Sequence, residues 1–545
     1  MPTLDLRHSA WIPVREQDGT ERELGLQDIL LGADKLREIR DPFPIVEFGI
    51  YRLLVALVMD IYSFKDRRDF EDLLQAGTFD SGRINNYFEA NKDRFDLFHP
   101  EHPFLQFAGM QEETDKPLSG LMPPIPSGTN ANHFHHVHEA EFGVSPEAAA
   151  RLLTTLAPFM TAGGAGLAPS INGSPPWYVL LTGETLFQTL CLNCCVLAHL
   201  PQGNTGVPAW RRNGEFIVER RQSASLLEGL TWQPRRILLI PGGPGCCSLT
   251  GRQSDVLVRS MKFTPGAAAG FVWTDPNVAY KLDAKGPMVL RPQEGKQVWR
   301  DVGPLALLKD SVSGTGDERV QFTRPRLVDQ YAELCRDEIT KSLVPRNLCL
   351  TLYGMRTDLK MKIFEWQRES LDPLPAPLVL FTQFGNTAQQ EINRAGKVDK
   401  GLVRALKCAY PRDGKGNSKA FDSRIEYARR SFWNALRSDY WTLLTDFSAI
   451  DPAQVEVETK SLIAQWKSRL EKIGWKTLEE AVQDLESNML LRTEVVVRSE
   501  FAKALYFALE KEGSGNKKGD KKASAEKKSG TPKQADIEPK GEQRI

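Results

Sequence analysis

The segment FDSRIEYARRSFWNALRSDY, residues 421–440, carries a clear helical periodicity. Its apolar residues recur at spacings of three and four, which places them on one face of a helix. These residues are Phe421, Ile425, Ala428, Phe432, Leu436 and Tyr440. A second face follows Asp451 and Pro452, a pair that favours a helix start, and it comprises Val455, Leu462, Trp466, Leu470 and Ile473. With segments 378–409 and 476–511 they predict a four-helix bundle, broken at 410–418 and near Gly474.

The chain before this bundle has a different character. Residues 1–372 mix short β-like runs with helical segments and many Gly and Pro breaks. The β-like runs are WIPV (11–14), ILLIP (237–241) and LCLTLYG (348–354). We therefore predict an α+β protein, with a large irregular mixed α/β N-terminal domain over 1–372 and the C-terminal four-helix bundle over 373–511. The apolar run at 48–62 contains Arg52 and Asp60 and is too short to span a bilayer, so it indicates a buried helix without membrane contact.

Composition limits the class of protein. The 545 residues contain 70 Lys and Arg against 70 Asp and Glu, which excludes a uniformly positive coat for nucleic acid. Residues 511–545 carry ten basic and six acidic residues, a net +4, and they lack aromatic residues. We expect a disordered basic tail over 512–545. Eight Cys, some of them adjacent, do not suggest a disulfide framework, and no secretion signal opens the chain, so we expect a cytoplasmic protein.

The densest group of polar side chains is ANHFHHVHE, residues 131–139. It contains five residues of types that bind metal ions, but their spacing does not place them on one face of a helix or strand. They are His133, His135, His136, His138 and Glu139. A His loop with one aromatic residue can also contact bases, phosphates or protein, and an inert polar loop is a third interpretation. The alternative function that this cluster allows is a metal-dependent phosphodiesterase.

No motif specifies an active site. The phosphate-binding GxxxxGK[ST], HExxH and GxSxG patterns are absent, so we expect no catalytic residue, no cofactor and no metal. The segment CLNCC, residues 191–195, has one metal-knuckle spacing in an apolar run, which favours buried thiols. The segment RTDLKMK, residues 356–362, follows a strand-like run and suits either a wedge that enters a duplex or a surface turn before a helix.

Several segments occur together in an order that resembles the CasA family, the large subunit of the type I-E CRISPR Cascade complex. They are SAWIPVR (9–15), EHPFLQ (101–106), SGTNANHF (127–134), the Gly-rich segment at 163–166, GLTWQP (229–234) and the terminal helices. The resemblance covers nearly residues 1–511. It implies a non-catalytic subunit that binds double-stranded target DNA, recognises the protospacer-adjacent motif (PAM) and starts strand separation. It also implies contact with the crRNA 5′ handle and the backbone and small Cascade subunits, and recruitment of a helicase-nuclease.

The resemblance also assigns residues. It implies a PAM loop at Gly163, Gly164 and Gly166, a reaching lysine at Lys262, and a strand-separating wedge at Arg356, Thr357, Asp358, Leu359 and Lys360. This wedge lacks the amide side chain of some relatives. The guide-handle and subunit contact loop matches Asn132, Phe134, His135 and His136. Some relatives hold zinc with four Cys, and the matching positions here are Ser145, Ala148, Cys247 and Thr250, so we expect no zinc.

Overall fold

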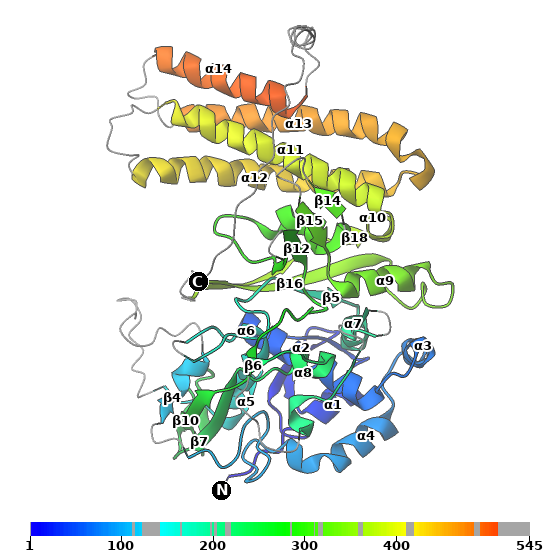
Figure 1. Cartoon of the computed structure of the whole chain (residues 1–545), viewed down its shortest axis with the longest axis vertical. Coiled ribbons are helices and arrows are strands. Elements are labelled where there is room, and N and C mark those ends of the chain that lie inside the picture. The colour runs from blue at the N-terminus through cyan, green and yellow to red at the C-terminus, as the bar shows by residue number, and fades with distance from the viewer. Residues whose placement is uncertain are drawn as a thin grey trace, which may run out of the picture.

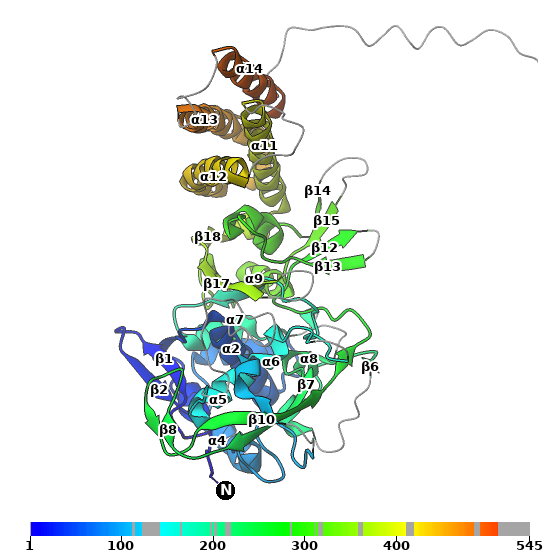
Figure 2. The same cartoon turned by 90° about the vertical axis from the view of Figure 1, so that its left-hand side faces the viewer.

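The structure is a computed structural model, and it describes the greater part of the chain. The residues described are 2–111, 115–122, 142–163, 166–196, 199–200, 204–212, 220–283, 286–309, 311–313, 320–357, 363–409, 419–483 and 491–510. Figure 1 shows a mixed body that contains the N-terminus, with a stack of long helices above it. In the view turned by 90° about the vertical axis, the bundle again lies above the body (Figure 2).

Helix α2 (Pro44–Tyr62) lies at the centre of the body and is buried along nearly its whole length. Its two charged residues singled out above have opposite charges beside them. Arg52 Nη1 lies 2.8 Å from Asp275 Oδ2, and Asp60 Oδ1 lies 2.7 Å from Arg211 Nη1. The predicted buried helix is therefore confirmed. Within the described parts of the chain, no helix has the length and apolar character needed to cross a membrane.

Strand β16 (Asn347–Thr357) organises the sheet that covers α2. It pairs antiparallel with β17 (Ile363–Ser370), β5 (Tyr178–Thr182) and the short β18 (Leu374–Pro375). A second sheet has the order β4-β10-β7, formed by Lys116–Pro117, Val258–Pro265 and Arg235–Pro241. A third has the order β2-β1-β3, with β1 at Ile12–Glu16. Strands β1, β7 and β16 confirm the three runs predicted from the sequence.

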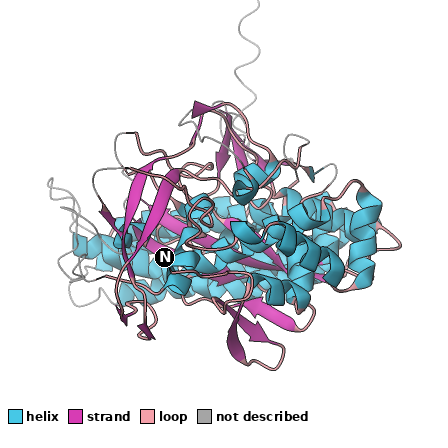
Figure 3. Ribbon diagram, turned by 90° about the horizontal axis from the view of Figure 1, so that it is seen from below, coloured by secondary structure: helices cyan, strands magenta, loops and turns pink. Residues whose placement is uncertain are grey.

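Shorter elements complete the body, and in the view of Figure 3 strands flank the helices. The remaining strands are β2 (Glu21–Leu24), β3 (Leu36–Ile39), β6 (Arg220–Arg221), β8 (Gly245–Cys246), β9 (Gln253–Ser254), β11 (Ala268–Ala269), β12 (Tyr280–Asp283), β13 (Gly286–Val289), β14 (Ser311–Ser313) and β15 (Val320–Thr323). The remaining helices before the bundle are α1 (Leu26–Leu31), α3 (Arg67–Ala76), α4 (Ser81–Ala90), α5 (Pro146–Leu153), α6 (Leu156–Phe159), α7 (Leu186–Asn193), α8 (Leu226–Leu230), α9 (Arg326–Arg336) and α10 (Ala376–Leu380).

The predicted four-helix bundle is confirmed. It consists of α11 (Thr382–Lys407), α12 (Lys419–Ser448), α13 (Val455–Gln483) and α14 (Leu491–Ala508). The predicted apolar face of α12 is buried at Ile425, Ala428, Phe432, Leu436 and Tyr440. On α13 Trp466 and Leu470 are buried, while Leu462 and Ile473 pack at the edge of the core.

The predicted break near Gly474 is wrong, because α13 continues through this residue. A Cβ atom at Gly474 would lie 3.0 Å from Phe501 Cζ of α14 and 3.4 Å from Val398 Cγ1 of α11. The glycine therefore serves close helix packing and does not end a helix.

The bundle rests on the body through aromatic side chains. Trp299, in the short helix η7 (Val298–Asp301), has its ring centroid 5.9 Å from that of Trp433 and 5.7 Å from that of Tyr440, both on α12. The Arg300 guanidinium lies 3.6 Å from the Trp433 ring centroid. Body and bundle therefore share one apolar core. The boundary between 372 and 373 stays a prediction.

Candidate nucleic-acid interface

The glycine loop, residues 161–169, follows helix α6. Gly163 donates its N–H to the Leu167 carbonyl at 3.3 Å, so the loop turns back on itself. Gly166 has a φ of +80°, a conformation that favours glycine. Among the described residues no atom lies within 4 Å of the position that a Cβ of Gly166 would occupy. The crest of the loop is therefore open at Gly166, while Gly164 lies outside the described residues.

Arg235, which the sequence analysis missed, joins the two ends of this loop. Its Nη2 donates to the Thr161 carbonyl at 2.8 Å, and its Nη1 donates to the Ala168 carbonyl. Arg235 opens strand β7 directly after the GLTWQP segment, and only 1% of its surface is exposed. The available sequence signal was a pair of arginines, Arg235 and Arg236, at the start of a strand whose other residues are apolar. Such an arginine must find acceptors inside the protein.

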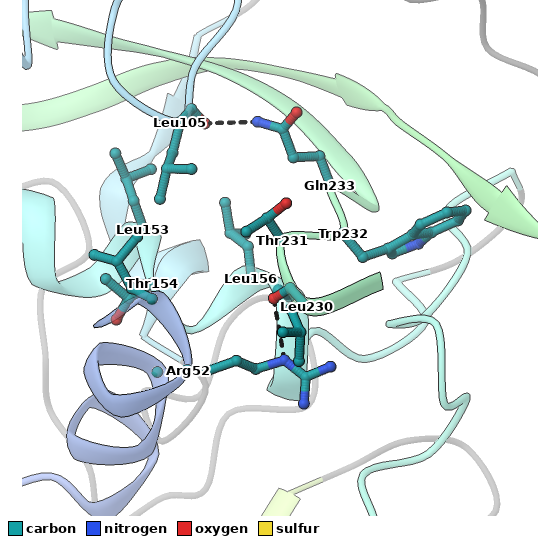
Figure 4. Close-up of a pocket in the computed structure, with 12 residues that line it drawn as sticks. Arg52, Leu105, Leu153, Thr154, Leu156, Leu230, Thr231, Trp232 and Gln233 are labelled. Carbon is teal, nitrogen blue, oxygen red and sulfur yellow. Dashed lines mark hydrogen bonds between the residues drawn. The ribbon is translucent and has the colours of Figure 1, made fainter. Parts of the chain in front are cut away.

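Two of the sequence segments that support the family resemblance, EHPFLQ and GLTWQP, meet beside this loop. Gln233 of GLTWQP donates to the carbonyl of Leu105 of EHPFLQ at 3.1 Å, as Figure 4 shows. Gln106 accepts from the N–H of Leu239 in β7 at 2.7 Å. Leu105 adopts a left-handed φ of 54°, which costs energy in a non-glycine residue. These contacts fix the start of β7, and therefore Arg235, against the body.

A small cavity lies beneath these segments (Figure 4). Its volume is about 20 Å³, and its lining includes Arg52, Leu105, Leu230 and Gln233. This is room for about one water molecule. In its wall, Arg52 donates from Nε to the Leu230 carbonyl at 3.0 Å. The cavity is too small for a nucleotide or substrate.

Lys262 lies in β10 on the other face of the same sheet. Strand pairing sets Pro265 opposite Arg235 and Lys262 opposite Leu238. Side chains alternate between the two faces of a strand, so Lys262 and Arg235 point to opposite sides. Lys262 Nζ lies 2.7 Å from Asp115 Oδ1. The structure therefore places Lys262 near the strands that support the glycine loop, but not on the face that holds it.

The segment proposed as a wedge lies between β16 and β17. Arg356 pairs with Glu365 across the two strands, with Nε and Oε1 2.9 Å apart, and Arg356 Nη1 lies 3.4 Å from Glu294 Oε2. Thr357, the last residue of β16, pairs in register with Ile363. The chain therefore continues into a strand, and the alternative of a turn before a helix is wrong. Asp358, Leu359 and Lys360 lie outside the described residues.

The root of this hairpin is fixed to α2. Arg368 of β17 donates to Glu47 Oε1 at 2.8 Å, and the Tyr353 hydroxyl of β16 donates to the same oxygen. Glu47 is fully buried, and this burial raises the pKa of its carboxyl group. At Gly354 a Cβ would lie 2.7 Å from the Trp177 ring, so only glycine lets this ring pack against the strand. The hairpin thus rises from a rigid, hydrogen-bonded base.

The contact loop cannot be placed in the same way. Asn132, Phe134, His135 and His136 lie outside the described residues, as do His133, His138 and Glu139 of the alternative metal cluster. Among the residues that the structure does describe, no group of three or more His, Cys, Asp and Glu is arranged to hold a metal ion.

The segments that hold zinc in some relatives do come together here. Ser248 donates its N–H to the Gly143 carbonyl at 2.8 Å, and the Ser145 hydroxyl accepts the N–H of Ala148 at the start of α5. Of the four matching positions only Cys247 offers a thiol, and Ala148 has no donor atom. This set does not fit the four sulfur or nitrogen ligands of structural zinc.

The cysteines of CLNCC are buried thiols, as predicted. Cys191, Cys194 and Cys195 are free and buried, and this burial raises the pKa of each thiol above its usual value. A thiol with a raised pKa is a poor nucleophile and a poor metal ligand at neutral pH. These residues therefore act as small apolar core residues.

The comparison with known families identifies the chain. The sequence profile of the family described as CRISPR-associated protein Cse1 matches residues 5–477. The chain belongs to the CRISPR-associated Cse1 family. A CasA/Cse1 protein of Thermus thermophilus is 30% identical over 414 residues, which cover 73% of this chain and 75% of that protein. The resemblance stated from the sequence is therefore confirmed.

Solved Cse1 structures share the fold. Cse1 of Thermobifida fusca superposes with a TM-score of 0.71 at 20% identity, covering 93% of this chain and 98% of that one. Cse1 of Acidimicrobium ferrooxidans gives 0.69 at 22% identity, covering 94% and 99%. A chain of a CRISPR RNA-guided surveillance complex gives 0.68 at 19% identity, covering 92% and 100%. The mixed body followed by a helical bundle is thus the architecture of these proteins.

Proposed function

We propose that this Cse1 protein is the large subunit of a type I-E Cascade complex, where it binds duplex target DNA, reads the PAM and starts strand separation. The main support is the family match over residues 5–477, together with a β-hairpin that rises from a buried, hydrogen-bonded root. A chain of similar fold belongs to a CRISPR RNA-guided surveillance complex. In such complexes protein reads a short flanking motif, while guide pairing reads the target.

PAM reading fits the glycine loop. A loop that reaches the floor of a minor groove must bring its backbone close to base edges, and Gly166 carries no side chain on its open side to prevent this. Gly163 belongs to the same loop, where its missing side chain leaves room for Leu167 and Arg235. The minor groove separates A·T from G·C pairs but distinguishes little else. The protein should therefore accept several related PAM sequences, with Gly164 as a further member of the loop. We assign Lys262 to a separate DNA contact, because it lies on the opposite face of the sheet, where it pairs with Asp115.

Strand separation fits the hairpin. A wedge between base pairs needs a rigid support, a compact tip and nearby cations. Glu47 and Arg368 supply the rigid support, since the buried Glu47 carboxylate ties β17 to α2. The tip sequence contributes Leu359 as an apolar side chain and Lys360 as a cation. We assign Arg356 to the stability of the hairpin, because it already pairs with Glu365.

The remaining roles concern partners. We assign Asn132, Phe134, His135 and His136 to contact with the crRNA 5′ handle and the backbone subunit. The small Cascade subunit and the helicase-nuclease complete the set of proposed partners. In this assignment the Cse1 chain itself cleaves nothing, and cleavage belongs to the recruited helicase-nuclease.

Reconstitution tests the proposal. Complexes assembled with guide RNA, with and without this chain, would be titrated with target duplexes that carry randomised flanks. We expect tight, flank-dependent binding and strand opening only when the chain is present, with affinity that falls steeply as salt rises. Equal target binding by the complex without the chain would refute the assignment, as would DNA cleavage by the isolated chain.

A further inference from the structure

Arg235 has an unusual environment for a buried cation. It is 1% exposed, and no described carboxylate forms an ion pair with it. Its guanidinium instead donates to three main-chain carbonyls, those of Thr161 at 2.8 Å, Pro234 at 2.8 Å and Ala168. Two of these acceptors are the residues on either side of the glycine crest. A single side chain thus spans the opening of the loop.

The guanidinium keeps its charge in this position. Burial lowers the pKa of Arg235 to about 10, so the side chain stays protonated at neutral pH. The guanidinium also lies 5.7 Å from the Phe263 ring centroid, which limits its movement on the side facing β10. Among the described atoms Nε has no hydrogen-bond partner. The protein therefore holds a desolvated positive charge directly behind the loop, a costly arrangement for packing alone.

We propose that Arg235 is the positioning residue of the glycine loop, which it holds at a fixed width so that Gly163 and Gly166 meet the DNA in one conformation. This inference rests on the proposed role of the loop in PAM reading. The planar fork of an arginine can donate to two carbonyls in fixed directions, which other side chains cannot reproduce. We call these hydrogen bonds from Arg235 to Thr161 and Ala168 the clamp. A glycine-rich segment without the clamp would lose more conformational entropy on binding DNA.

The clamp should govern discrimination between flanks more than general affinity for DNA. Contacts to phosphates contribute to binding of every duplex, whereas contacts to base edges depend on an accurate loop position. A loop of variable width would still touch the groove, but it would no longer separate good flanks from poor ones. The charge behind the loop adds attraction for any duplex, and this part should appear as a smaller change shared by all flanks.

The test compares assembled complexes that carry wild-type chain, Arg235→Met, Arg235→Lys or the control Arg22→Met. Arg22 lies in β2, in another sheet, and pairs with Glu16 at 2.7 Å, so the control removes one charge far from the loop in sequence and sheet. Binding is measured by gel-shift titration with a preferred and a scrambled flank. We expect Arg235→Met to reduce the ratio of the two affinities roughly tenfold. Arg235→Lys should retain part of the ratio, and Arg22→Met all of it.

Each result decides the inference. A wild-type ratio for Arg235→Met would overturn it. If Arg235→Met does not assemble, Arg235→Lys carries the test, with an expected loss of about threefold in the ratio, and a wild-type ratio for that variant would overturn the inference.

Gly166→Asp, measured in parallel, separates this inference from the proposed function. Normal flank preference for Gly166→Asp rejects the loop as PAM reader. Lost preference for Gly166→Asp with a normal ratio for Arg235→Met rejects only the role of Arg235.

Discussion

Arg368 Nε of strand β17 donates a 2.8 Å hydrogen bond to Glu47 Oε1 of helix α2, and this contact joins residues 321 positions apart in the sequence. The carboxylate is fully buried, whereas the arginine side chain is 24% exposed. The hairpin is therefore joined to the centre of the body through a carboxylate that solvent does not reach.

Removal of this contact should weaken both stability and strand opening. Glu47→Ala removes the shared acceptor of Arg368 and the Tyr353 hydroxyl and leaves Arg368 with its 3.3 Å ion pair to Glu38, so we expect a loss of about 2 to 3 kcal/mol in the free energy of unfolding. Calorimetry measures the loss, and fluorescence from a base analogue beside the PAM measures strand opening. A double-mutant cycle with Arg368→Met isolates the pair, since the second change should add little once the first is present. Additive effects would show that the pair does not act as a unit.

The pair of Arg52 and Asp275 should matter for stability alone. Their side chains are 1% and 0% exposed, and the charged atoms lie 2.8 Å apart. Asp275→Ala should cost about 3 to 5 kcal/mol because it leaves a buried guanidinium without its partner. Chemical denaturation of the isolated chain gives this value. The double variant with Arg52→Met should recover part of the loss, and a double variant less stable than Asp275→Ala would contradict this explanation.

The role of Gly166 in DNA binding can be tested by comparison with Gly173, a glycine of similar backbone conformation. Gly166 and Gly173 have φ values of +80° and +73°, and the described residues leave open space at the Cβ position of each. Either change to Asp should destabilise the fold by about 1 kcal/mol, because both residues adopt a left-handed conformation. Only Gly166→Asp should also weaken binding to a PAM duplex, since its carboxylate would face the DNA. Equal loss of DNA affinity in both variants would mean that the effect is structural.

The lysines assigned to DNA contact should change the salt dependence of binding. Replacing Lys262 and Lys360 together by Ala should lower the slope of log affinity against log salt by roughly 2, about one for each lost phosphate contact. Gel-shift titrations at several salt concentrations measure the slope. Lys35→Ala with Lys65→Ala, two exposed lysines elsewhere in the body, is the matched control. An unchanged slope in the first variant would remove these lysines from the site.

Two glycines of helix α11 should respond in opposite directions to the same change. At Gly396 a Cβ would meet no described atom within 4 Å, whereas at Gly401 it would lie 2.5 Å from Ala504 Cβ of α14. Gly396→Ala should stabilise the chain by about 0.8 kcal/mol through helix propensity. Gly401→Ala should cost about 1 to 3 kcal/mol because α14 must move away. Thermal unfolding decides, and a gain in both variants would show that α14 adjusts freely.

Much of the fold could be predicted because it depends on local patterns. The apolar spacing from Ile425 to Tyr440 predicts a buried helix face whatever the neighbouring elements are. The charges of Arg52 and Asp60, together with the short length of the apolar run at 48–62, excluded a membrane helix. Gly474 misled because glycine usually weakens a helix, whereas here Phe501 and Val398 approach it from other helices. The arrangement of those partners depends on tertiary packing, which periodicity does not encode.

The candidate site was less accessible to sequence reasoning for the same reason. The open position at Gly166 could be inferred from the glycine itself, whereas a Cβ at Gly163 would lie 3.1 Å from Leu167 Cδ1, so that glycine serves packing within the loop. The role of Arg235 could not, because its acceptors at Thr161 and Ala168 become neighbours only when β7 packs behind the loop. Likewise, Glu47 and Arg368 show no local pattern that indicates their contact.

The cross-strand pair of Arg356 and Glu365 closes the hairpin just below residues 358–362. Because the pair, the strand register and the link to α2 are all made by residues outside 358–362, these five residues can be exchanged for those of another family member without changing any of these contacts. The two strands can therefore serve as an unchanged scaffold for different connecting loops. A library of variants with grafted loops at 358–362 would compare how well different sequences separate the strands of a duplex.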